Sequence, residues 1–480
     1  MAISIVPRPA HVTHYGGRYD ETVCPLTYRA DPSLPAEGYR ITLRADGGEA
    51  AYADDGGRFY AAQTLRQLRA PDGTYPCVCI EDAPRYPYRA FMVDSARHMQ
   101  SVAQLKTLIE AAALLKFNRF HWHLTDDQGW RMESQSFPRL NEISAWRACD
   151  GFLNDDGVRY GGYYTREEIR GIVAFCAERQ ITVIPEIDMP GHMVALLAAY
   201  PDLSCTGRVT AVSTHAGIHK DVLCVGKDAT FQMMTRLLDE VCDLFPGEWV
   251  HIGGDEVPPQ RWQNCEDCRA RMRRLGVTDP AALHSDFINR IAAYLKAKGR
   301  RAVTWNDTLK GGDLDRDVVV CNWMDKTGRC IDRANSGGLV IEEDFFHYYL
   351  DYPYGMTPLR KTYGFDPMRA GLTEIGRANV IGVETPIWTE FVRDFKQLCF
   401  MCFPRMLAVA ERGWTPPQLL NGKDFAARAR ALLPLLQTIG ITAAPPKTWD
   451  PRALGRWKGL AQHYCRVLRV AHENRGVEEA

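Results

Sequence analysis

Short runs of β-branched, aromatic and other apolar residues recur eight times between residues 90 and 383, with amphipathic helical patterns between most of them. Strands that alternate with helices build parallel sheets, and eight such units are what a (β/α)8 barrel requires. We therefore predict a (β/α)8 barrel. A doubly wound open sheet competes with it, but no glycine-rich phosphate turn follows the first run. The runs cover residues 90–94, 120–124, 181–187, 249–252, 302–305, 318–323, 338–341 and 380–383.

Two of the segments between these runs begin with a capping box, the Ser/Thr-x-x-Glu/Gln pattern that satisfies free backbone N–H groups at a helix start. Ser101 and Gln104 form one box, and Thr165 and Glu168 form the other. Apolar residues then follow at helical spacing, which predicts helices on the outside of the barrel. The connection between the sixth and seventh runs is too short for a full helix and is the weakest point of the barrel prediction.

The chain on either side of the barrel has a different texture. Residues 39–44 alternate like a half-buried strand, residues 58–68 follow a helical pattern, and residues 77–80 form another short apolar run. We divide the chain into a small α+β domain (1–86), a catalytic barrel (87–420) and a C-terminal helical extension (421–480).

The charge pattern argues against two kinds of partner. The 58 Lys and Arg nearly balance the 59 Asp and Glu, and no long run carries one sign. Neither nucleic acid nor a membrane is therefore an expected partner. No stretch reaches the roughly 20 apolar residues of a membrane span, and residues 1–7 lack the basic start of a signal peptide. As given, the chain is predicted to be cytoplasmic, and its oligomeric state stays open.

The fifteen cysteines are an odd number, so they cannot all form disulfides. Such usage fits a reducing compartment. Cys265 and Cys268, and also Cys399 and Cys402, have the spacing of half a zinc site. The first pair is expected in a loop and the second in an apolar helix far from it. We therefore predict no metal site and no cofactor.

Polar or large aromatic side chains follow every predicted barrel strand, and the reacting groups of such barrels come from those strand ends. Carboxylates with one arginine can hold several hydroxyls, and aromatic rings can cover the apolar faces of a sugar. A phosphate would need more cations or a glycine-rich nest. The pattern therefore predicts a sugar ligand. The residues are Asp94 and Arg97, Asp126 and Asp127, Asp188 and His192, Asp255 and Glu256, Trp305, Trp323, Tyr349 and Asp351, and Trp388 and Glu390.

These residues lie in segments that resemble the signature blocks of the family 20 glycoside hydrolases, the β-N-acetylhexosaminidases. Seven blocks in the same order, each at a strand exit, are more specific than any one of them, and the likeness extends over residues 3–415. The N-terminal unit also resembles the small α+β domain that precedes the barrel in that family. The blocks are 94–98 (DSARH), 121–131 (HWHLTDDQGWR), 185–192 (PEIDMPGH), 251–256 (HIGGDE), 305–306, 349–351 and 388–390.

The resemblance implies a retaining, exo-acting hydrolase of terminal β-linked N-acetylglucosamine or N-acetylgalactosamine. The substrate's own acetamido oxygen would be the nucleophile, and an oxazolinium ion the intermediate. Glu256 would act as acid and base, Asp255 would hold the acetamido N–H, and Tyr349 would donate to its carbonyl oxygen. Asp126 and His192 would form a relay behind Glu256. The implied substrate contacts are Arg97, Trp305, Trp323, Asp351, Trp388 and Glu390, with a further aromatic expected at Tyr363 or Phe365.

Three other functions compete. His121 and His123 share one face of a strand and, with Asp188 and His192, could bind a divalent ion as in metal-dependent barrel hydrolases. A sugar-binding barrel without activity would not need both members of the Asp-Glu pair. An endo-acting, chitinase-like enzyme would need an open cleft, whereas Arg97 and Glu390 are expected to close the pocket around a terminal sugar.

Overall fold

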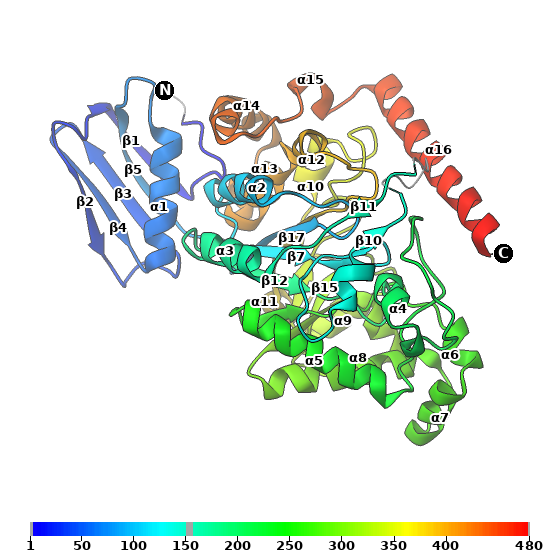
Figure 1. Ribbon diagram of the computed structural model, residues 1–480. Coiled ribbons are helices and arrows are strands. Elements are labelled where there is room, and N and C mark those ends of the chain that lie inside the picture. The colour runs from blue at the N-terminus through cyan, green and yellow to red at the C-terminus, as the bar shows by residue number, and fades with distance from the viewer. Residues whose placement is uncertain (1–2, 150–156, 479–480) are drawn as a thin grey trace.

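Eight parallel strands close into a barrel in the computed structural model, which describes residues 3–149 and 157–478 (Figure 1). Neighbouring strands pair in parallel, and the last strand closes the ring by pairing with the first, from Gly382 opposite Tyr88 to Ile387 opposite Val93. All eight predicted strands are present, which confirms the barrel. They are β6 (Tyr88–Asp94), β7 (Arg119–His123), β12 (Thr182–Glu186), β13 (Trp249–His251), β14 (Arg301–Trp305), β15 (Val319–Asn322), β16 (Val340–Glu342) and β17 (Val380–Ile387).

Helices surround the strands, and both predicted capping boxes are formed. Ser101 begins α2 and Thr165 begins α3, each with its side chain accepting a hydrogen bond from the backbone three residues on. The helices of this ring and its loops are α2 (Val102–Leu114), α3 (Arg166–Ala177), α4 (Val194–Ala199), α5 (Asp228–Leu244), α6 (Gln260–Asn264), α7 (Glu266–Leu275), α8 (Pro280–Ala297), α9 (Arg329–Asn335), α10 (Leu359–Gly364), α11 (Glu374–Asn379), α12 (Phe395–Cys402) and α13 (Arg405–Trp414).

The connection that was expected to be too short for a helix holds one. Helix α9 lies between β15 and β16, whereas β14 and β15 are joined only through the 3₁₀ helix η3 (Asn306–Gly311). The barrel thus has its shortest crossover one unit earlier than the sequence pattern indicates. Further short elements lie in the loops: β8 (Thr125–Asp126), β9 (Gly129–Trp130), β10 (Trp146–Arg147), β11 (Tyr160–Gly161), the π-helix η1 (Leu140–Ser144), and the 3₁₀ helices η2 (Pro201–Leu203) and η4 (Pro417–Leu419).

The N-terminal domain is a five-stranded sheet with one helix on it, α1 (Asp55–Leu68). The predicted strand 39–44 and the run 77–80 correspond to β3 (Tyr39–Arg44) and β5 (Tyr75–Asp82). The other three strands were not predicted, since β1 and β2 are mostly exposed and carry no clear alternation of burial. They are β1 (His11–Tyr19), β2 (Leu26–Ala30) and β4 (Gly47–Tyr52), and the sheet order is β1-β5-β3-β4-β2.

A buried polar cluster joins this domain to the barrel. Lys116, at the end of α2, donates from Nζ to the Tyr39 hydroxyl (2.7 Å) and to Asp82 Oδ2 (3.1 Å). The indole Nε1 of Trp414 donates to the same Asp82 oxygen at 2.9 Å, and the Trp414 ring belongs to the apolar core of the N-terminal domain. The Lys116 and Asp82 side chains are both 0% exposed, so the two domains share one interior.

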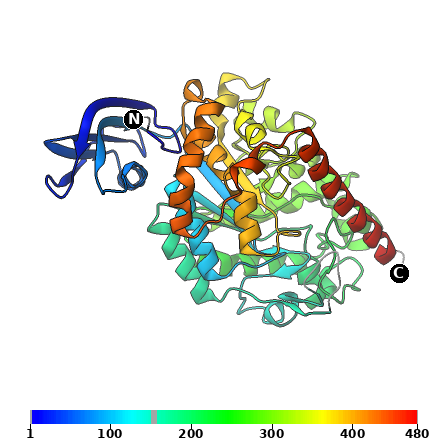
Figure 2. The ribbon, with the colours of Figure 1, turned by 90° about the horizontal axis from the view of Figure 1, so that it is seen from above.

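Three helices follow the barrel: α14 (Gly422–Ile439), α15 (Pro446–Trp449) and α16 (Ala453–Glu478). Helix α14 buries Leu432 and Leu436 in the same apolar core as the barrel helix α2. Helix α16 lies on the side of the barrel opposite the N-terminal sheet, as both ribbon views show (Figures 1 and 2).

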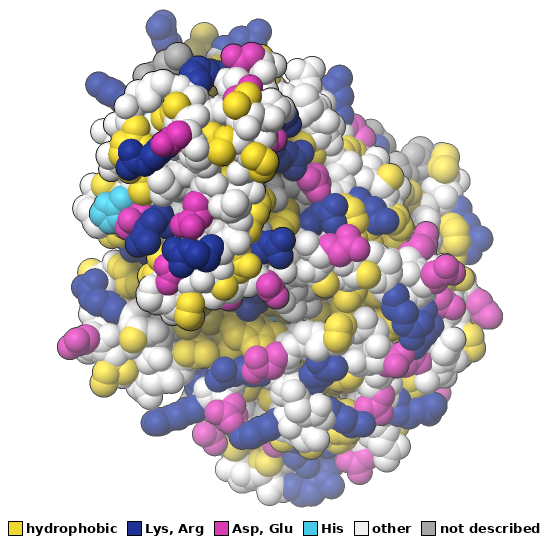
Figure 3. All heavy atoms as spheres, turned by 90° about the vertical axis from the view of Figure 1, so that its left-hand side faces the viewer, with side chains coloured by type: hydrophobic (Ala, Val, Ile, Leu, Met, Phe, Trp, Pro, Cys, Tyr) yellow, Lys and Arg dark blue, Asp and Glu magenta, His cyan; other side chains and the backbone are white. Residues whose placement is uncertain are grey.

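The face of the molecule that carries the N-terminal domain mixes basic and acidic side chains without a large field of one sign (Figure 3). Within residues 3–149 and 157–478, none of the helices has both the length and the apolar character needed to cross a bilayer. Met1 and Ala2, part of the segment used for the localisation prediction, lie outside the described residues.

Candidate active site

A cavity of about 570 Å³ lies where the predicted site residues meet. Its walls come from the loops after β6, β12, β13, β15, β16 and β17. Asp126 lies behind this cavity and Trp305 beneath it, and neither is among its lining residues. The predicted residues that line it are Arg97, His192, Asp255, Glu256, Trp323, Tyr349, Asp351, Trp388 and Glu390.

The Asp255–Glu256 pair follows two glycines in a turn with positive φ values. Gly253 and Gly254 have φ values of +66° and +99°, and Glu256 itself has φ +47°. A Cβ at position 253 would meet Asp188 Oδ1 at 1.6 Å, so a side chain there would displace this carboxylate. Asp188 in turn accepts a hydrogen bond from Gly254 N at 3.2 Å. A non-glycine residue with positive φ is strained, and such strain gathers at functional sites.

His192 connects the cavity to the carboxylates behind it. Its Nδ1 lies 3.2 Å from Asp126 Oδ1 and 3.1 Å from Asp127 Oδ2, and its Nε2 lies 3.7 Å from both Asp255 Oδ2 and Glu256 Oε2. Burial opposes the charged ring, but the carboxylates of Asp126 and Asp255 raise the pKa of His192 well above its usual range. These distances would allow His192 to link Asp126 to Glu256, and the relay itself stays a prediction.

Four buried polar atoms of the cavity walls have no hydrogen-bond partner among the described residues: His192 Nε2, Asp255 Oδ1, Asp351 Oδ1 and Trp388 Nε1. A buried polar group without a partner is costly, and in a native protein it points to a ligand or water. Their convergence on one cavity indicates a ligand with several hydrogen-bonding groups.

Three carboxyl groups of this cavity have raised pKa values. Burial, reinforced by the neighbouring Glu256 and opposed by His192, raises the pKa of Asp255 to about 7. Burial also raises the pKa of Glu256, although His192 opposes the shift. Asp351 has its pKa raised to about 8 by burial and by the Glu390 carboxylate. Raised carboxyl pKa values are what a general acid at neutral pH needs.

Arg97 forms the cationic corner of the cavity. Its guanidinium lies 2.8 Å from Asp126 Oδ2 and 3.8 Å from Glu390 Oε1, and its side chain is 5% exposed. Its Cζ also lies 5.1 Å from the centre of the Trp388 ring. Arg97 and Glu390 therefore stand together at one edge of the cavity, where the pair can receive sugar hydroxyls.

Aromatic rings form another part of the wall. The Tyr349 ring lies 6.4 Å from Trp323 and 6.3 Å from Trp388, centre to centre. Burial raises the pKa of Tyr349 well above its usual range, so its hydroxyl stays a proton donor. Trp323 is fixed by its indole Nε1, which donates to Asp307 Oδ2 at 2.8 Å. Trp305 is 1% exposed and backs Trp388 at 6.0 Å, so direct contact of Trp305 with a substrate stays a prediction.

The histidines of the competing metal-hydrolase hypothesis are occupied by carboxylates. His121 Nδ1 pairs with Glu384 Oε1 at 2.5 Å, and His123 pairs with Glu186 on one side and with Asp126 Oδ2 (2.9 Å) on the other. Glu186 also receives the indole N–H of Trp305 at 2.8 Å. These side chains form a closed network in the barrel interior, below the cavity.

The prediction of an aromatic at Tyr363 or Phe365 is wrong, because neither residue lines the cavity. Tyr363 donates its hydroxyl to Glu411 and stacks on Phe425, and Phe365 stacks on His347. Sequence reasoning also missed several lining residues. Some directly follow a predicted site residue in the chain, and others come from separate loops or from α16, where no local pattern marks them. The missed residues are Ala216, Gly217, Ile218, Met324, Phe345, Tyr352, Phe391 and His463.

The reasoning against a metal site treated the two Cys-x-x-Cys pairs as isolated. Cys399 and Cys402 do lie on the buried face of α12. Cys265 and Cys268, however, lie at the start of α7 and meet Cys205 and Cys224, which come from the loop before α5. The spacing of Cys265 and Cys268 alone therefore did not reveal that two further cysteines lie beside them.

A (β/α)8 barrel whose strand exits gather carboxylates, an arginine and two tryptophans around one cavity defines a carbohydrate-active enzyme scaffold. The sequence model of the glycosyl hydrolase family 20 catalytic domain matches residues 86–417, and that of domain 2 of the same family matches residues 8–83. The chain belongs to glycosyl hydrolase family 20.

Curated relatives and solved structures agree with this assignment. A β-hexosaminidase of Akkermansia muciniphila is 35% identical over 88% of this chain and 88% of its own. One of Porphyromonas gingivalis is 39% identical over 84% of this chain, which spans 54% of that relative's length. The structure of a family 20 exo-β-N-acetylglucosaminidase of Vibrio harveyi, in complex with N-acetylglucosamine, superposes with a TM-score of 0.84 at 30% identity, covering 92% of this chain and 78% of that one.

Proposed function

We propose that the chain is a retaining, exo-acting β-N-acetylhexosaminidase that uses substrate-assisted catalysis. The observation that carries the proposal is the set of unpartnered buried atoms, His192 Nε2, Asp255 Oδ1 and Asp351 Oδ1, around a cavity with one aromatic wall. A terminal N-acetylhexosamine offers an amide N–H, several hydroxyls and an apolar ring face, which match these groups. Family membership gives the same substrate class.

In the first step, the acetamido carbonyl oxygen attacks C1 of the sugar while the bond from C1 to the leaving oxygen breaks. Glu256 gives its carboxyl proton to that oxygen. Asp255 accepts the acetamido N–H and stabilises the positive charge of the oxazolinium ion, and the Tyr349 hydroxyl donates to the attacking oxygen. Holding this internal nucleophile in place replaces a bimolecular step, which lowers the barrier through effective molarity.

In the second step, the Glu256 carboxylate takes a proton from water, and the resulting hydroxide oxygen attacks C1 from the face that the leaving group vacated. The C1 bond to the acetamido oxygen breaks, the amide is restored, and Glu256 is protonated again. Two displacements at C1 give net retention. His192, held by Asp126, faces both carboxyl groups and limits how far their pKa values rise.

Six further side chains in and beneath the cavity wall bind the sugar. Arg97 and Glu390 hold hydroxyls at one edge, Asp351 holds the 6-hydroxyl end, and Trp323, Trp388 and Trp305 enclose the acetamido group. A cavity closed by the Arg97–Glu390 pair favours a terminal sugar over an internal one. The partner class is a small molecule or oligosaccharide with a terminal N-acetylhexosamine, not nucleic acid or a membrane. The free state of all fifteen cysteines supports a cytoplasmic, reducing location.

Paired aryl β-glycosides test the proposal. The protein should release the aryl group from N-acetyl-β-glucosaminide or N-acetyl-β-galactosaminide, and almost none from the matching β-glucoside or β-galactoside that lacks the acetamido group. Proton NMR of the first product should show the β-anomer. Cleavage of both glycoside types at similar rates, or an α-anomer as first product, would refute the assisted mechanism. No cleavage of either would favour a sugar-binding barrel.

A further inference from the structure

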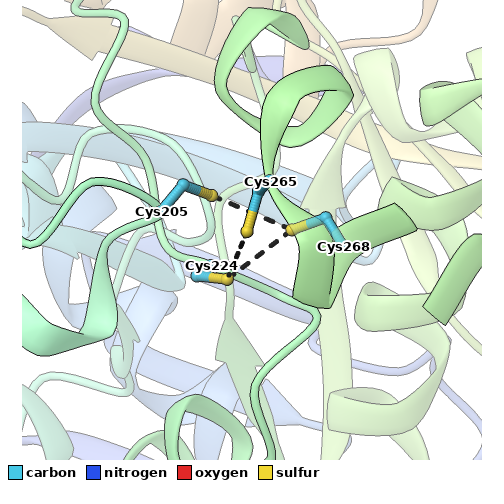
Figure 4. Close-up of side chains that lie close together, drawn as sticks. All are labelled: Cys205, Cys224, Cys265 and Cys268. Carbon is cyan, nitrogen blue, oxygen red and sulfur yellow. Dashed lines mark hydrogen bonds between the residues drawn. The ribbon is translucent and has the colours of Figure 1, made fainter. Parts of the chain in front are cut away.

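Four cysteine side chains from two distant segments converge on one point (Figure 4). The Sγ atoms of Cys224 and Cys265 are 3.6 Å apart, those of Cys224 and Cys268 are 3.6 Å apart, and those of Cys205 and Cys268 are 3.8 Å apart. All four sulfurs lie within 4.8 Å of one another. Three of the four residues are buried, and Cys205 is half-buried.

These distances match a tetrahedral site for a single metal ion. A zinc–sulfur bond is about 2.3 Å, so two sulfurs at corners of a regular tetrahedron are about 3.8 Å apart. A disulfide would need about 2.05 Å between the sulfurs of a pair, and all four thiols are free. Structural zinc sites have four protein ligands in a tetrahedron, whereas catalytic zinc sites leave one position for water or substrate. Four thiols around one point therefore match a structural site.

The surrounding backbone is shaped to bring the two segments together. An added Cβ at Gly226 would lie 2.3 Å from the carbonyl carbon of Asp267 and 2.4 Å from Cys268 N, so the segments touch backbone to backbone at this glycine. On the loop side, Cys224 N donates to Leu203 O at 2.7 Å. Trp262 from α6 donates its indole N–H to Leu223 O at 2.9 Å.

Positive groups lie near the cluster. Cys265 is the N-cap residue of α7 and Cys268 lies in its first turn, where the positive end of the helix dipole stabilises negative charge. Lys227 lies three residues after Cys224, and its Nζ donates to the carbonyl oxygens of Asp202 and Ser204 beside Cys205. A Zn²⁺ ion with four thiolates has a net charge of about −2, which these positive groups partly offset.

We propose that Cys205, Cys224, Cys265 and Cys268 bind one structural zinc ion. On binding, each thiol gives its proton to solvent and its sulfur forms a bond to zinc, so the metal is neither oxidised nor reduced. The bound ion joins both ends of the loop 205–224 to the start of α7, which follows Glu256 closely in the chain. Because Ala216, Gly217 and Ile218 of this loop line the cavity, the ion also holds one wall of the site in place.

Metal analysis of the full-length protein, purified without chelator and without metal-affinity chromatography, tests the proposal directly. Elemental analysis should find one zinc per chain. Cobalt(II) grown into the protein in place of zinc should give the visible absorption of a tetrahedral thiolate complex. Absence of metal, iron in place of zinc, or an intact mass four hydrogens lighter, which would indicate two disulfides, would overturn it.

Variants of matched chemistry locate the ion. Cys205→Ala and Cys268→Ala should lose most of the bound zinc and unfold at lower temperature. The double variant Cys399→Ala/Cys402→Ala removes the other Cys-x-x-Cys pair, also buried, and should keep its zinc. Zinc retained at the wild-type level by the first two variants would contradict the assignment. If these two variants fail to fold, the wild-type protein can be titrated with an organomercurial while a chromophoric chelator measures the released zinc. Zinc release should then accompany the titration of four thiols.

The effect on the cavity wall rests on the proposed function and has its own readout. Loss of zinc should raise KM for an aryl N-acetylhexosaminide more than it lowers kcat, since the loop contributes lining but none of the proposed acid–base groups. An unchanged KM in a variant that has lost its zinc would refute this effect while the metal site stands. If no aryl glycoside is cleaved at all, the proposed function fails and the zinc content is unaffected.

Discussion

The barrel interior and the cavity above it both contain buried carboxylates, and Glu186 of the interior differs sharply in its partners from Asp255 and Asp351 of the cavity. In the interior, Glu186 contacts His121, His123 and His251 and accepts the Trp305 indole N–H. In the cavity, Asp255 and Asp351 each have an oxygen without a partner. The histidines lower the pKa of Glu186 against the effect of burial, whereas burial raises the pKa values of the other two. Glu186 therefore has the contacts of a residue that stabilises the fold, whereas Asp255 and Asp351 each keep an oxygen available to a ligand.

The largest effect is expected for the acid. Glu256→Gln should lower kcat on substrates with poor leaving groups by about 10²–10⁴, the range for loss of a general acid, and much less on aryl glycosides with good leaving groups. A series of aryl substrates of graded leaving-group pKa measures this dependence. Glu374→Gln, an exposed change on α11, is the control. An equal loss across the whole series would contradict the assignment of Glu256 as acid.

Loss of the interior carboxylate should act on stability. Glu186→Gln removes the carboxylate that His121, His123 and His251 share, and breaking a buried ion pair in this way costs about 3–5 kcal/mol. Urea unfolding monitored by tryptophan fluorescence gives the free energy of unfolding. A variant as stable as the wild type would show that the interior network is not what stabilises the barrel.

Asp255→Asn should lower kcat by about 10²–10³, as removal of one stabilising group in a preorganised site does. Unlike Glu256→Gln, it should do so even with a good leaving group, because the oxazolinium ion forms in every case. Circular dichroism and the unfolding midpoint should stay close to the wild type. Wild-type turnover of 4-nitrophenyl N-acetylglucosaminide by this variant would exclude the proposed role.

Asp351→Asn should increase stability while weakening substrate binding. The folded-state pKa of Asp351, about 8, lies above the unfolded value, so the folded state holds this proton more tightly. Its contribution to the free energy of unfolding is therefore lost as pH rises from about 4 to about 8. The asparagine variant should gain about 0.5–2 kcal/mol at pH 8, typical for relief of a strained functional site, and less at pH 5. A loss of stability at pH 8 would place Asp351 with the structural set.

The smallest effect is a shift of a pH profile. The His192 cation lowers the pKa values of both Asp255 and Glu256. His192→Gln should therefore move both limbs of the kcat/KM profile to higher pH, because Asp255 must be ionised and Glu256 protonated. Profiles that coincide after correction for overall rate would show that His192 is only a packing residue.

The sequence predicts those parts of the molecule whose signal is local. The β6 and β7 strands and the Ser101 and Thr165 caps follow from periodicity and from hydrogen bonds within four residues. Asp255 and Glu256 could be found because their turn requires Gly253 and Gly254 beside them. Ile218 and His463 reach the cavity through packing between distant segments, for which no spacing rule exists. The same holds for Cys205 and Cys224, which lie 63 and 44 residues before Cys268.

The ammonium of Lys116 has consequences for how the chain can be divided. Its charge belongs to the barrel, while the Asp82 carboxylate that neutralises it lies in the N-terminal sheet. A barrel severed from residues 1–86 would keep a cation with no counter-ion in an apolar setting and would leave the Trp414 ring facing water. We therefore expect the N-terminal domain and the barrel to unfold together, and neither to be stable as a separate fragment.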